Sequence, residues 1–151
     1  MTKKVLVVLN EETDPPGLVG QWLAERDIEL EIVRAYEGQP VPTQVPDGYA
    51  GVMAFGGYMG ANDDAEHPWL AQERELLGNA VAAEVPVFGV CLGGQLLATA
   101  IGGTVERTPD IEIGVVDMQV AHDASADPVF GAISGTTVAA AQWHQDYISA
   151  L

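Results

Sequence analysis

Short apolar runs rich in β-branched residues alternate along this sequence with segments of helical periodicity. This alternation constrains the fold more than any other feature. The strand-like runs are residues 5–9, 28–33, 48–57 and 85–90. The segments with helical spacing are residues 18–26, 68–81 and 92–101. Because strands that alternate with helices pair in parallel through right-handed crossovers, the pattern predicts an α/β fold: a doubly wound, open, mostly parallel sheet with helices on both faces.

The pattern changes after Gly103, near the C-terminal end of the sequence. Two further strand-like segments, residues 113–121 and 136–144, are separated by a polar loop at 122–133 with no long helix between them. We therefore expect a small antiparallel excursion there. With 151 residues in all, the sequence is most simply a single domain, residues 1–151.

The charge of the chain excludes some classes of partner. There are 22 acidic and 6 basic residues, for a formal net charge of -16. Such a surface repels phosphate backbones and anionic membranes, so we expect neither nucleic acid nor a membrane as partner. One cysteine cannot form an internal disulfide, and the first apolar run is too short for a signal peptide or a membrane span. These features predict a cytoplasmic protein.

The single cysteine, Cys91, stands in "GVCLG", between a strand-like and a helix-like segment. A nucleophile on a sharp strand-to-helix turn, with small residues two positions away on either side, is a nucleophile elbow. Gly89 and Gly93 would leave room where the helix approaches the neighbouring strands. The helix N-terminus would favour the thiolate, and the N–H of Leu92 would be available to an oxyanion. Without this context, a lone cysteine is usually a small buried hydrophobic residue.

A glycine-rich motif, "GGYMG" at residues 56–60, follows the preceding strand. Its N–H groups would project from the same carboxyl edge of the sheet as Cys91, where open α/β folds bind ligands. The alternative is an ordinary tight turn. A dinucleotide-binding loop fits poorly, because the sequence has no GxGxxG pattern.

Together, "FGGYMGANDDAEHPWLAQERELL", "VPVFGVCLGGQLLATAIGGTVE", "EIG" and "WHQD" resemble the class I glutamine amidotransferases, and within them the GMP synthetase-like branch. These motifs occur in the family's order through most of the chain. The resemblance implies a flavodoxin-like fold and a glutaminase that supplies ammonia to an acceptor. It implies L-glutamine as substrate, an ammonia-accepting synthetase domain or subunit as partner, and neither a cofactor nor a metal.

The resemblance also assigns roles to individual residues. It makes Cys91 the nucleophile that attacks the glutamine side-chain amide, forms a γ-glutamyl thioester and releases ammonia. It gives the oxyanion hole to the N–H groups of Gly57 and Leu92. The positions matched to substrate binding are Gly56, Gln95, Trp143, Gln145 and Asp146. For Gln95, one helical turn after Cys91, the alternative is a polar residue on a solvated helix face.

The family's catalytic histidine and glutamate lie in an "HPE" segment after the "WHQD" equivalent, and this sequence stops at Leu151 before any such segment. We therefore expect the sequence to lack the family's C-terminal segment and to be catalytically incomplete. His144 is the candidate base with an acid nearby, whereas His67 and His122 fit capping or surface roles. Two alternative functions remain: a stand-alone γ-glutamyl hydrolase, and a glutamine-binding or regulatory domain without turnover.

Overall fold

The computed structural model describes residues 3–151, which divide into two compact units. The first unit contains the residues up to Arg107 together with Asp146–Leu151, and the second contains Thr108–Gln145. The elements of the first unit that precede residue 104 are β1 (Lys3–Leu9), α1 (Gly17–Ala24), β2 (Ile28–Arg34), η1 (Ala35–Glu37), β3 (Tyr49–Ala54), α2 (Trp69–Ala82), β4 (Val87–Gly89) and α3 (Leu92–Ala100).

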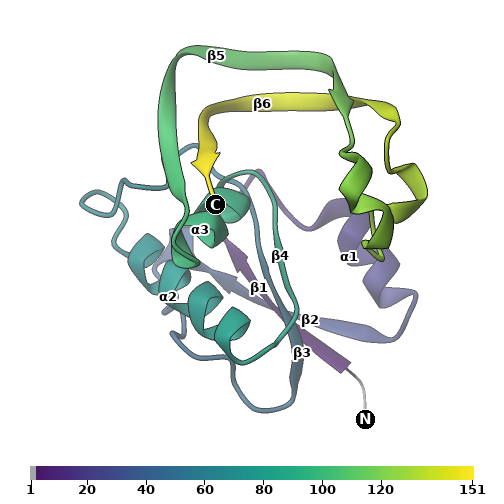
Figure 1. Ribbon diagram of the computed structural model, residues 1–151. Coiled ribbons are helices and arrows are strands. Elements are labelled where there is room, and N and C mark those ends of the chain that lie inside the picture. The colour runs from purple at the N-terminus through teal and green to yellow at the C-terminus, as the bar shows by residue number, and fades with distance from the viewer. Residues whose placement is uncertain (1–2) are drawn as a thin grey trace. The chain divides into compact units, whose positions relative to one another are not determined.

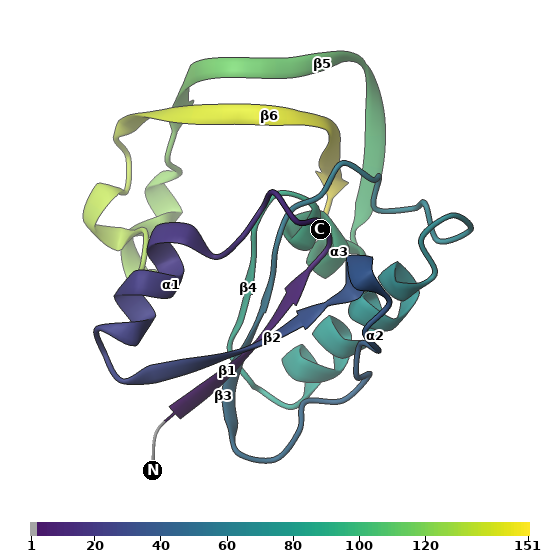
Figure 2. The same cartoon turned by 180° about the vertical axis from the view of Figure 1, so that it is seen from behind.

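A four-stranded parallel sheet with the order β2-β1-β3-β4 forms the centre of the first unit. Val7 of β1 pairs with Ile32 on one side and with Met53 on the other, and Met53 pairs with Phe88 of β4. Helix α1 covers one face of this sheet, and α2 and α3 cover the opposite face (Figures 1 and 2). The predicted doubly wound α/β fold is confirmed.

The two faces of β1 explain why this strand lies in the interior of the sheet. Leu6 and Val8 belong to the apolar cluster that also contains buried residues of α2 and α3. Val5, Val7 and Leu9 belong to a second cluster, against which residues of α1 and β2 pack. Side chains alternate across a strand, so an unbroken apolar run can fill two cores at once.

Several element boundaries differ from those predicted from the sequence. Strand β3 ends at Ala54, whereas the apolar run continues to Gly57, because the glycine pair leaves the sheet and begins a loop. Pro68 caps α2 rather than lying inside it, and the helix begins at Trp69. Proline has no N–H to donate, and this position needs none.

The excursion near the C-terminus is a two-stranded antiparallel sheet of β5 (Thr104–Gln119) and β6 (Thr137–Ala150). Two short 3-10 helices, η2 (His122–Ala126) and η3 (Gly131–Ile133), lie between these strands. The expected antiparallel pair is confirmed, but both strands are longer than predicted. The first part of β5, residues 104–110, has a single apolar residue, Val105, so it lacks the hydrophobic alternation that marks a strand.

Among residues 3–151, none of the helices has the length and apolar character needed to span a bilayer.

Candidate active site

Cys91 occupies a sharp turn between β4 and α3. Its backbone has φ 50° and ψ -112°, a conformation that residues with a side chain rarely adopt. Two backbone hydrogen bonds span this turn: the Gly93 N–H donates to the Val90 carbonyl at 2.9 Å, and the Gln95 N–H donates to the Cys91 carbonyl at 3.1 Å. A strained turn of this kind presents the Cys91 side chain in the elbow arrangement predicted from the sequence.

Two glycines allow α3 to pack directly on the sheet. A Cβ atom on Gly89 would lie 2.6 Å from the Gly93 carbonyl oxygen. A Cβ atom on Gly93 would lie 2.5 Å from the Ala54 carbonyl carbon and closer still to its oxygen. Both contacts are with backbone atoms, which cannot rotate away. The space-making role predicted for these two glycines is therefore confirmed.

The glycine pair after β3 lies beside the cysteine turn. A Cβ atom on Gly56 would lie 3.5 Å from the Cβ of Cys91, and one on Gly57 would lie 3.1 Å from the Cδ2 of Leu92. Strands β3 and β4 are adjacent and parallel, and Ala54 and Gly89 pair at their carboxyl ends. The structure thus brings together, at the same edge of the sheet, the nucleophile and oxyanion residues that the sequence predicts.

Carboxylates surround the thiol. The Oδ2 atom of Asp14, in the loop after β1, fills the space that a Gly56 side chain would need. Although Cys91 as a residue is exposed, burial is the main cause that raises the pKa of its thiol above the ordinary value. The negative charges of Asp14, Glu11 and Asp146 raise this pKa further, and the Leu92 N–H opposes them. The N–H at the start of α3 lowers the pKa of the thiol, as expected, but burial and the carboxylates outweigh it, so the expected net lowering of this pKa is wrong.

Gln95 points from α3 into the interior of the first unit. Its side chain is buried, and its Nε2 donates a hydrogen bond to the Asp146 carbonyl at 2.9 Å. The Asp146 carboxylate lies 3.4 Å from the Nε of Arg107 and would be 2.9 Å from a Cβ atom on Gly60. The solvated-face alternative for Gln95 is wrong, and Asp146, the last residue of "WHQD", is hydrogen-bonded to α3 within the first unit.

Three other candidates, Trp143, His144 and Gln145, belong to the second unit. Trp143 is 78% exposed. Gln145 exchanges two hydrogen bonds of 3.0 Å with Thr108. The Nε2 of His144 lies 2.7 Å from the Gln142 Oε1 and 3.3 Å from the Glu112 Oε2. Their proposed roles as substrate ligands, and that of His144 as base, stay predictions.

The other two histidines lie outside this group. His67 precedes α2, and its ring stacks edge-on between those of Tyr58 and Trp69, with centroids 5.6 and 5.0 Å away. His122 begins η2 in the second unit. Within residues 3–151, the search for metal sites found no group of three or more side chains placed to hold an ion.

Sequence reasoning missed a buried polar group behind the glycine pair, formed by Asn10, Glu73 and Trp69. Asn10 directly follows β1, and its side chain contacts both Glu73 and Trp69. One signal was available in the sequence. Glu73 lies three residues after Leu70 and four before Leu77, so it shares their apolar helix face. A carboxyl group on such a face needs a polar partner in the core.

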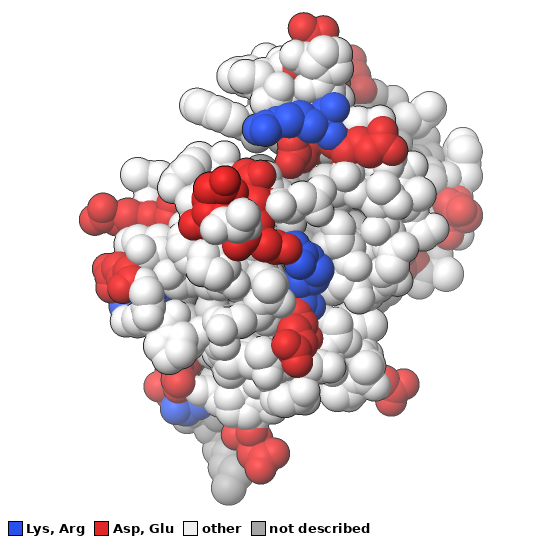
Figure 3. Space-filling model, turned by 90° about the vertical axis from the view of Figure 1, so that its left-hand side faces the viewer, with Lys and Arg blue, Asp and Glu red and all other residues white. Residues whose placement is uncertain are grey.

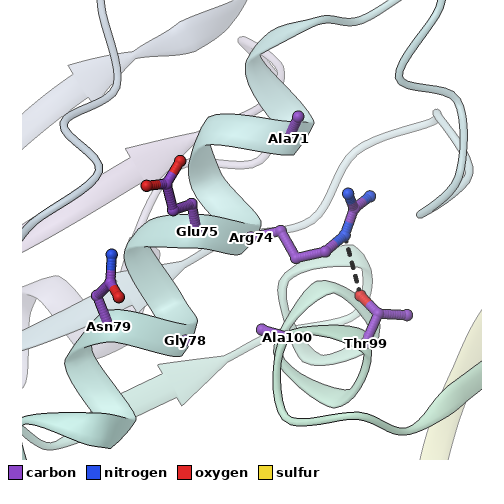
Figure 4. Close-up of a pocket in the computed structure, with 7 residues that line it drawn as sticks. All are labelled: Ala71, Arg74, Glu75, Gly78, Asn79, Thr99 and Ala100. Carbon is purple, nitrogen blue, oxygen red and sulfur yellow. Dashed lines mark hydrogen bonds between the residues drawn. The ribbon is translucent and has the colours of Figure 1, made fainter.

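An open pocket of about 450 Å³ lies on the outer side of α2 and α3. Figure 4 shows Arg74 reaching from α2 to Thr99 of α3, with 3.2 Å between the Nε and Oγ1 atoms. The guanidinium also contacts both carboxylate oxygens of Asp64 and the Ala61 carbonyl. Its donors are engaged within the fold, and none of the predicted site residues lines this pocket.

Acidic side chains are scattered over the face shown in Figure 3, and basic ones are few and lie beside acidic neighbours. No cluster of basic residues is visible on that face. The picture agrees with the excess of acidic residues in the sequence.

Comparison with known proteins extends these observations. The family model for glutamine amidotransferase class-I matches residues 18–151. The glutamine amidotransferase-like protein YfeJ of Salmonella typhimurium is 28% identical over 146 residues, which cover 95% of this chain and 60% of that protein. A GMP synthase of Clostridium kluyveri is 27% identical over 152 residues, covering 99% of this chain and 27% of that enzyme. The crystal structure of a glutamine amidotransferase from Thermotoga maritima superposes with a TM-score of 0.84 at 26% identity, covering 99% and 63% of the two chains.

This chain therefore belongs to the class I glutamine amidotransferase family. It spans 60% of the length of the Salmonella protein and 63% of the Thermotoga chain.

Proposed function

We propose that this chain is a glutamine-hydrolysing domain with Cys91 as its nucleophile. The observation that carries the proposal is the approach of Gly56 to Cys91 across the carboxyl ends of β3 and β4. This edge of an open parallel sheet is where doubly wound folds bind ligands. The strained backbone of Cys91 also supports the assignment, because strain of this kind concentrates at functional sites.

In the proposed reaction, the Cys91 sulfur attacks the amide carbon of the glutamine side chain, and the carbonyl oxygen takes up negative charge. The N–H groups of Gly57 and Leu92 would stabilise this oxyanion, and one such donor contributes about 3 kcal/mol. The amide nitrogen then takes a proton, the C–N bond breaks and ammonia leaves. Water hydrolyses the γ-glutamyl thioester, which yields glutamate and regenerates the thiol.

The substrate's α-amino and α-carboxylate groups are assigned to the "WHQD" segment. The bond from Gln95 to the Asp146 carbonyl supports this role for Asp146, because it holds the backbone of Asp146 at the helix that follows Cys91. Gly56, Trp143 and Gln145 complete the proposed substrate contacts.

Proton transfer to the leaving ammonia requires a general acid. The family resemblance assigns this task to a histidine in an "HPE" segment, which is absent from the 151 residues. We therefore propose that turnover needs such a histidine in addition to the groups that these 151 residues supply. The partners of His144, namely Gln142 and Glu112, lie within the second unit and give no support to His144 as the base.

The ammonia acceptor is proposed to be a synthetase domain or subunit. The C. kluyveri relative is a glutamine-hydrolysing GMP synthase, of which this chain covers only 27%. The corresponding arrangement here would join this domain to a synthetase that uses ammonia.

An ammonia-release assay tests this function. It compares the 151-residue chain, a version extended with an "HPE" segment, and Cys91→Ala in the extended version, each with and without a candidate synthetase. We expect rapid release only from the extended chain with Cys91, and release slower by at least about a hundredfold from the 151 residues. Ordinary turnover by the 151 residues, abolished by His144→Ala, would identify His144 as the base. Full activity of Cys91→Ala would refute the nucleophile assignment.

One observation favours a second candidate function, a glutamine-binding regulatory domain without turnover. Burial and nearby carboxylates raise the pKa of the Cys91 thiol, which lowers the fraction of reactive thiolate. This candidate predicts that the extended chain binds glutamine in a calorimeter and releases no ammonia with any synthetase.

A further inference from the structure

A buried carboxyl group lies behind the proposed oxyanion turn. Glu73 of α2 is completely buried, whereas Glu75, two positions further along the helix, is exposed. Its Oε1 accepts a hydrogen bond of 3.3 Å from the Nδ2 of Asn10. Its Oε2 is also buried and has no hydrogen-bond partner among the residues that the structure describes. Burying a carboxyl group is costly, so its presence here calls for a function.

Asn10 connects this carboxyl group to the backbone of the turn. Its Nδ2 also donates to the Phe55 carbonyl at 3.1 Å, and Phe55 directly precedes Gly56. Its Oδ1 accepts a hydrogen bond of 2.9 Å from the Nε1 of Trp69. Both ends of the amide are therefore engaged, and the side chain is held between β1, α2 and the loop after β3.

The same asparagine packs against the second glycine of the turn. A Cβ atom on Gly57 would lie 3.1 Å from the Cβ of Asn10 and equally far from the Cδ2 of Leu92. The space that a Gly57 side chain would need is thus filled by the Sδ of Met59, by Asn10 and by Leu92. A shift of Asn10 would be transmitted to the peptide groups on both sides of Gly56.

We propose that Glu73 is a positioning residue for the oxyanion turn: through Asn10 it fixes the Phe55–Gly56 peptide by the bond to the Phe55 carbonyl, and the Gly56–Gly57 peptide by the packing of Asn10 on Gly57. This inference rests on the proposed function for its catalytic consequence. Glu73 does not contact the substrate in this arrangement. Its effect reaches the reaction through a preorganised backbone donor, which is the kind of contribution that an oxyanion hole makes.

The protonation state of Glu73 fits this role. Burial raises its pKa to about 8, against the opposing effects of the Asn10 hydrogen bond and the Arg74 charge. The elements packed against α2 bring few charges: α3 and β4 contain no acidic or basic residue, and β3 contains only Tyr49 as a titratable group. In the loop before α2, Asp64 is paired with Arg74, and His67 stacks on Trp69.

A neutral Glu73 therefore holds Asn10 at neutral pH without placing a negative charge behind the oxyanion. Ionisation above about pH 8 would add such a charge, which opposes the developing negative charge on the substrate. The turn should then stabilise the oxyanion less as the pH rises, even though the Cys91 thiolate becomes more abundant.

Two reagents separate this effect from the reactivity of the thiol. The glutamine analogue 6-diazo-5-oxo-L-norleucine carries a carbonyl group that would occupy the oxyanion turn, whereas iodoacetamide alkylates a thiolate without needing that turn. The ratio of the two labelling rates at Cys91 cancels the thiolate fraction. The variants are Glu73→Ala, Glu73→Gln and Asn10→Ala, with Glu75→Gln as the matched control on an exposed position of the same helix.

We expect Glu73→Ala and Asn10→Ala each to lower this ratio by at least about tenfold, since a small misplacement of reacting groups costs up to about a hundredfold. The double variant should lower it no further. At neutral pH, Glu73→Gln should have the same ratio of labelling rates as the wild type. Above pH 8 the ratio should fall in the wild type but stay constant in Glu73→Gln. Glu75→Gln should match the wild type. An unchanged ratio in Glu73→Ala, or an equal loss with both reagents, would overturn the proposal.

A second measurement is independent of any chemistry at Cys91. In the ¹⁵N-labelled chain, the amide signals of Gly56 and Gly57 should shift together with a titration near pH 8, and the shift should disappear in Glu73→Gln but persist in Glu75→Gln. If the analogue fails to label the wild-type chain while these shifts occur, the proposed function fails and the positioning role stands. If the two glycine signals do not respond to the ionisation of Glu73, the positioning role is refuted.

Discussion

Replacing Gly93 with alanine tests whether α3 rests directly on the end of β3. The added Cβ would lie 2.5 Å from the Ala54 carbonyl carbon and 2.8 Å from the Ala54 Cβ. Ala54 is completely buried and pairs with β1 and β4, so its backbone has no room to move. Relief of the clash requires a shift of α3, and with it of Cys91.

Gly94 provides a matched control in the same helix. A Cβ atom there would meet only the Gly89 backbone, at 3.5 Å or more, which is ordinary contact. Alanine in place of glycine stabilises a helix by roughly 0.5–1 kcal/mol, so Gly94→Ala should be neutral or stabilising. Overpacking a core costs about 1–3 kcal/mol. We therefore expect Gly93→Ala to be less stable than Gly94→Ala by about 2 kcal/mol.

Thermal unfolding followed by circular dichroism measures this difference. For a chain of this length, about 2 kcal/mol corresponds to a Tm difference of roughly 4–8 °C. Labelling of Cys91 by the glutamine analogue should also fall in Gly93→Ala but not in Gly94→Ala. If the two variants unfold at the same temperature, α3 does not approach β3 as closely as the structure shows, and the explanation of the elbow glycines is wrong.

Three further predictions concern the surroundings of Cys91. Asp14→Asn removes a negative charge that raises the pKa of the thiol, so iodoacetamide should alkylate Cys91 faster than in the wild type at about pH 7; an unchanged rate would show that Asp14 has no influence. Gln95→Ala removes the bond to the Asp146 carbonyl and should weaken binding of a glutamine analogue by about threefold to tenfold in calorimetry, whereas equal affinity would exclude a role in the pocket. The carboxyl group of Glu73 keeps its proton up to about pH 8 in the folded chain, whereas in the unfolded chain it loses the proton near pH 4.5. The native chain thus binds more protons than the unfolded chain between these pH values, so the free energy of unfolding, measured by urea titration, should fall there by up to about 1.4 kcal/mol per pH unit. Glu73→Gln should abolish this slope, and a slope that persists in that variant would contradict the raised pKa of Glu73.

The sequence predicts the central sheet well because its strands are buried on both faces. Continuous apolar runs such as the one in β1 are a strong signal, and the glycines around Cys91 mark the places where backbones must approach closely. The long ribbon of β5 and β6 was predicted only in part. Residues 104–110 of β5 contain Val105 as their one apolar residue and therefore show no alternating pattern, and cross-strand pairing between distant segments leaves little local trace.

The sequence predicted where Gly57 and Cys91 lie better than it predicted the electrostatic environment of the Cys91 thiol. Motifs placed Gly57 and Cys91 at one edge, because strand ends in a parallel sheet share that edge. The raised pKa of the Cys91 thiol was missed because it depends first on burial and then on charges such as those of Asp14 and Glu11, and neither the burial nor these contacts can be seen from the residues around Cys91 in the sequence. The role of Asn10 was equally hidden, since its partners are 45 and 63 residues away in the sequence.

The most direct test of the central claim is to identify the residue that reacts with a glutamine analogue. The chain is incubated with 6-diazo-5-oxo-L-norleucine, with and without excess L-glutamine, and the adduct is located by mass spectrometry of its peptides. We predict one adduct per chain, on Cys91, which glutamine suppresses and which is absent in Cys91→Ala. An adduct at another residue, no adduct at all, or labelling of Cys91 that glutamine does not slow would contradict the assignment of this edge of the sheet as a glutamine site.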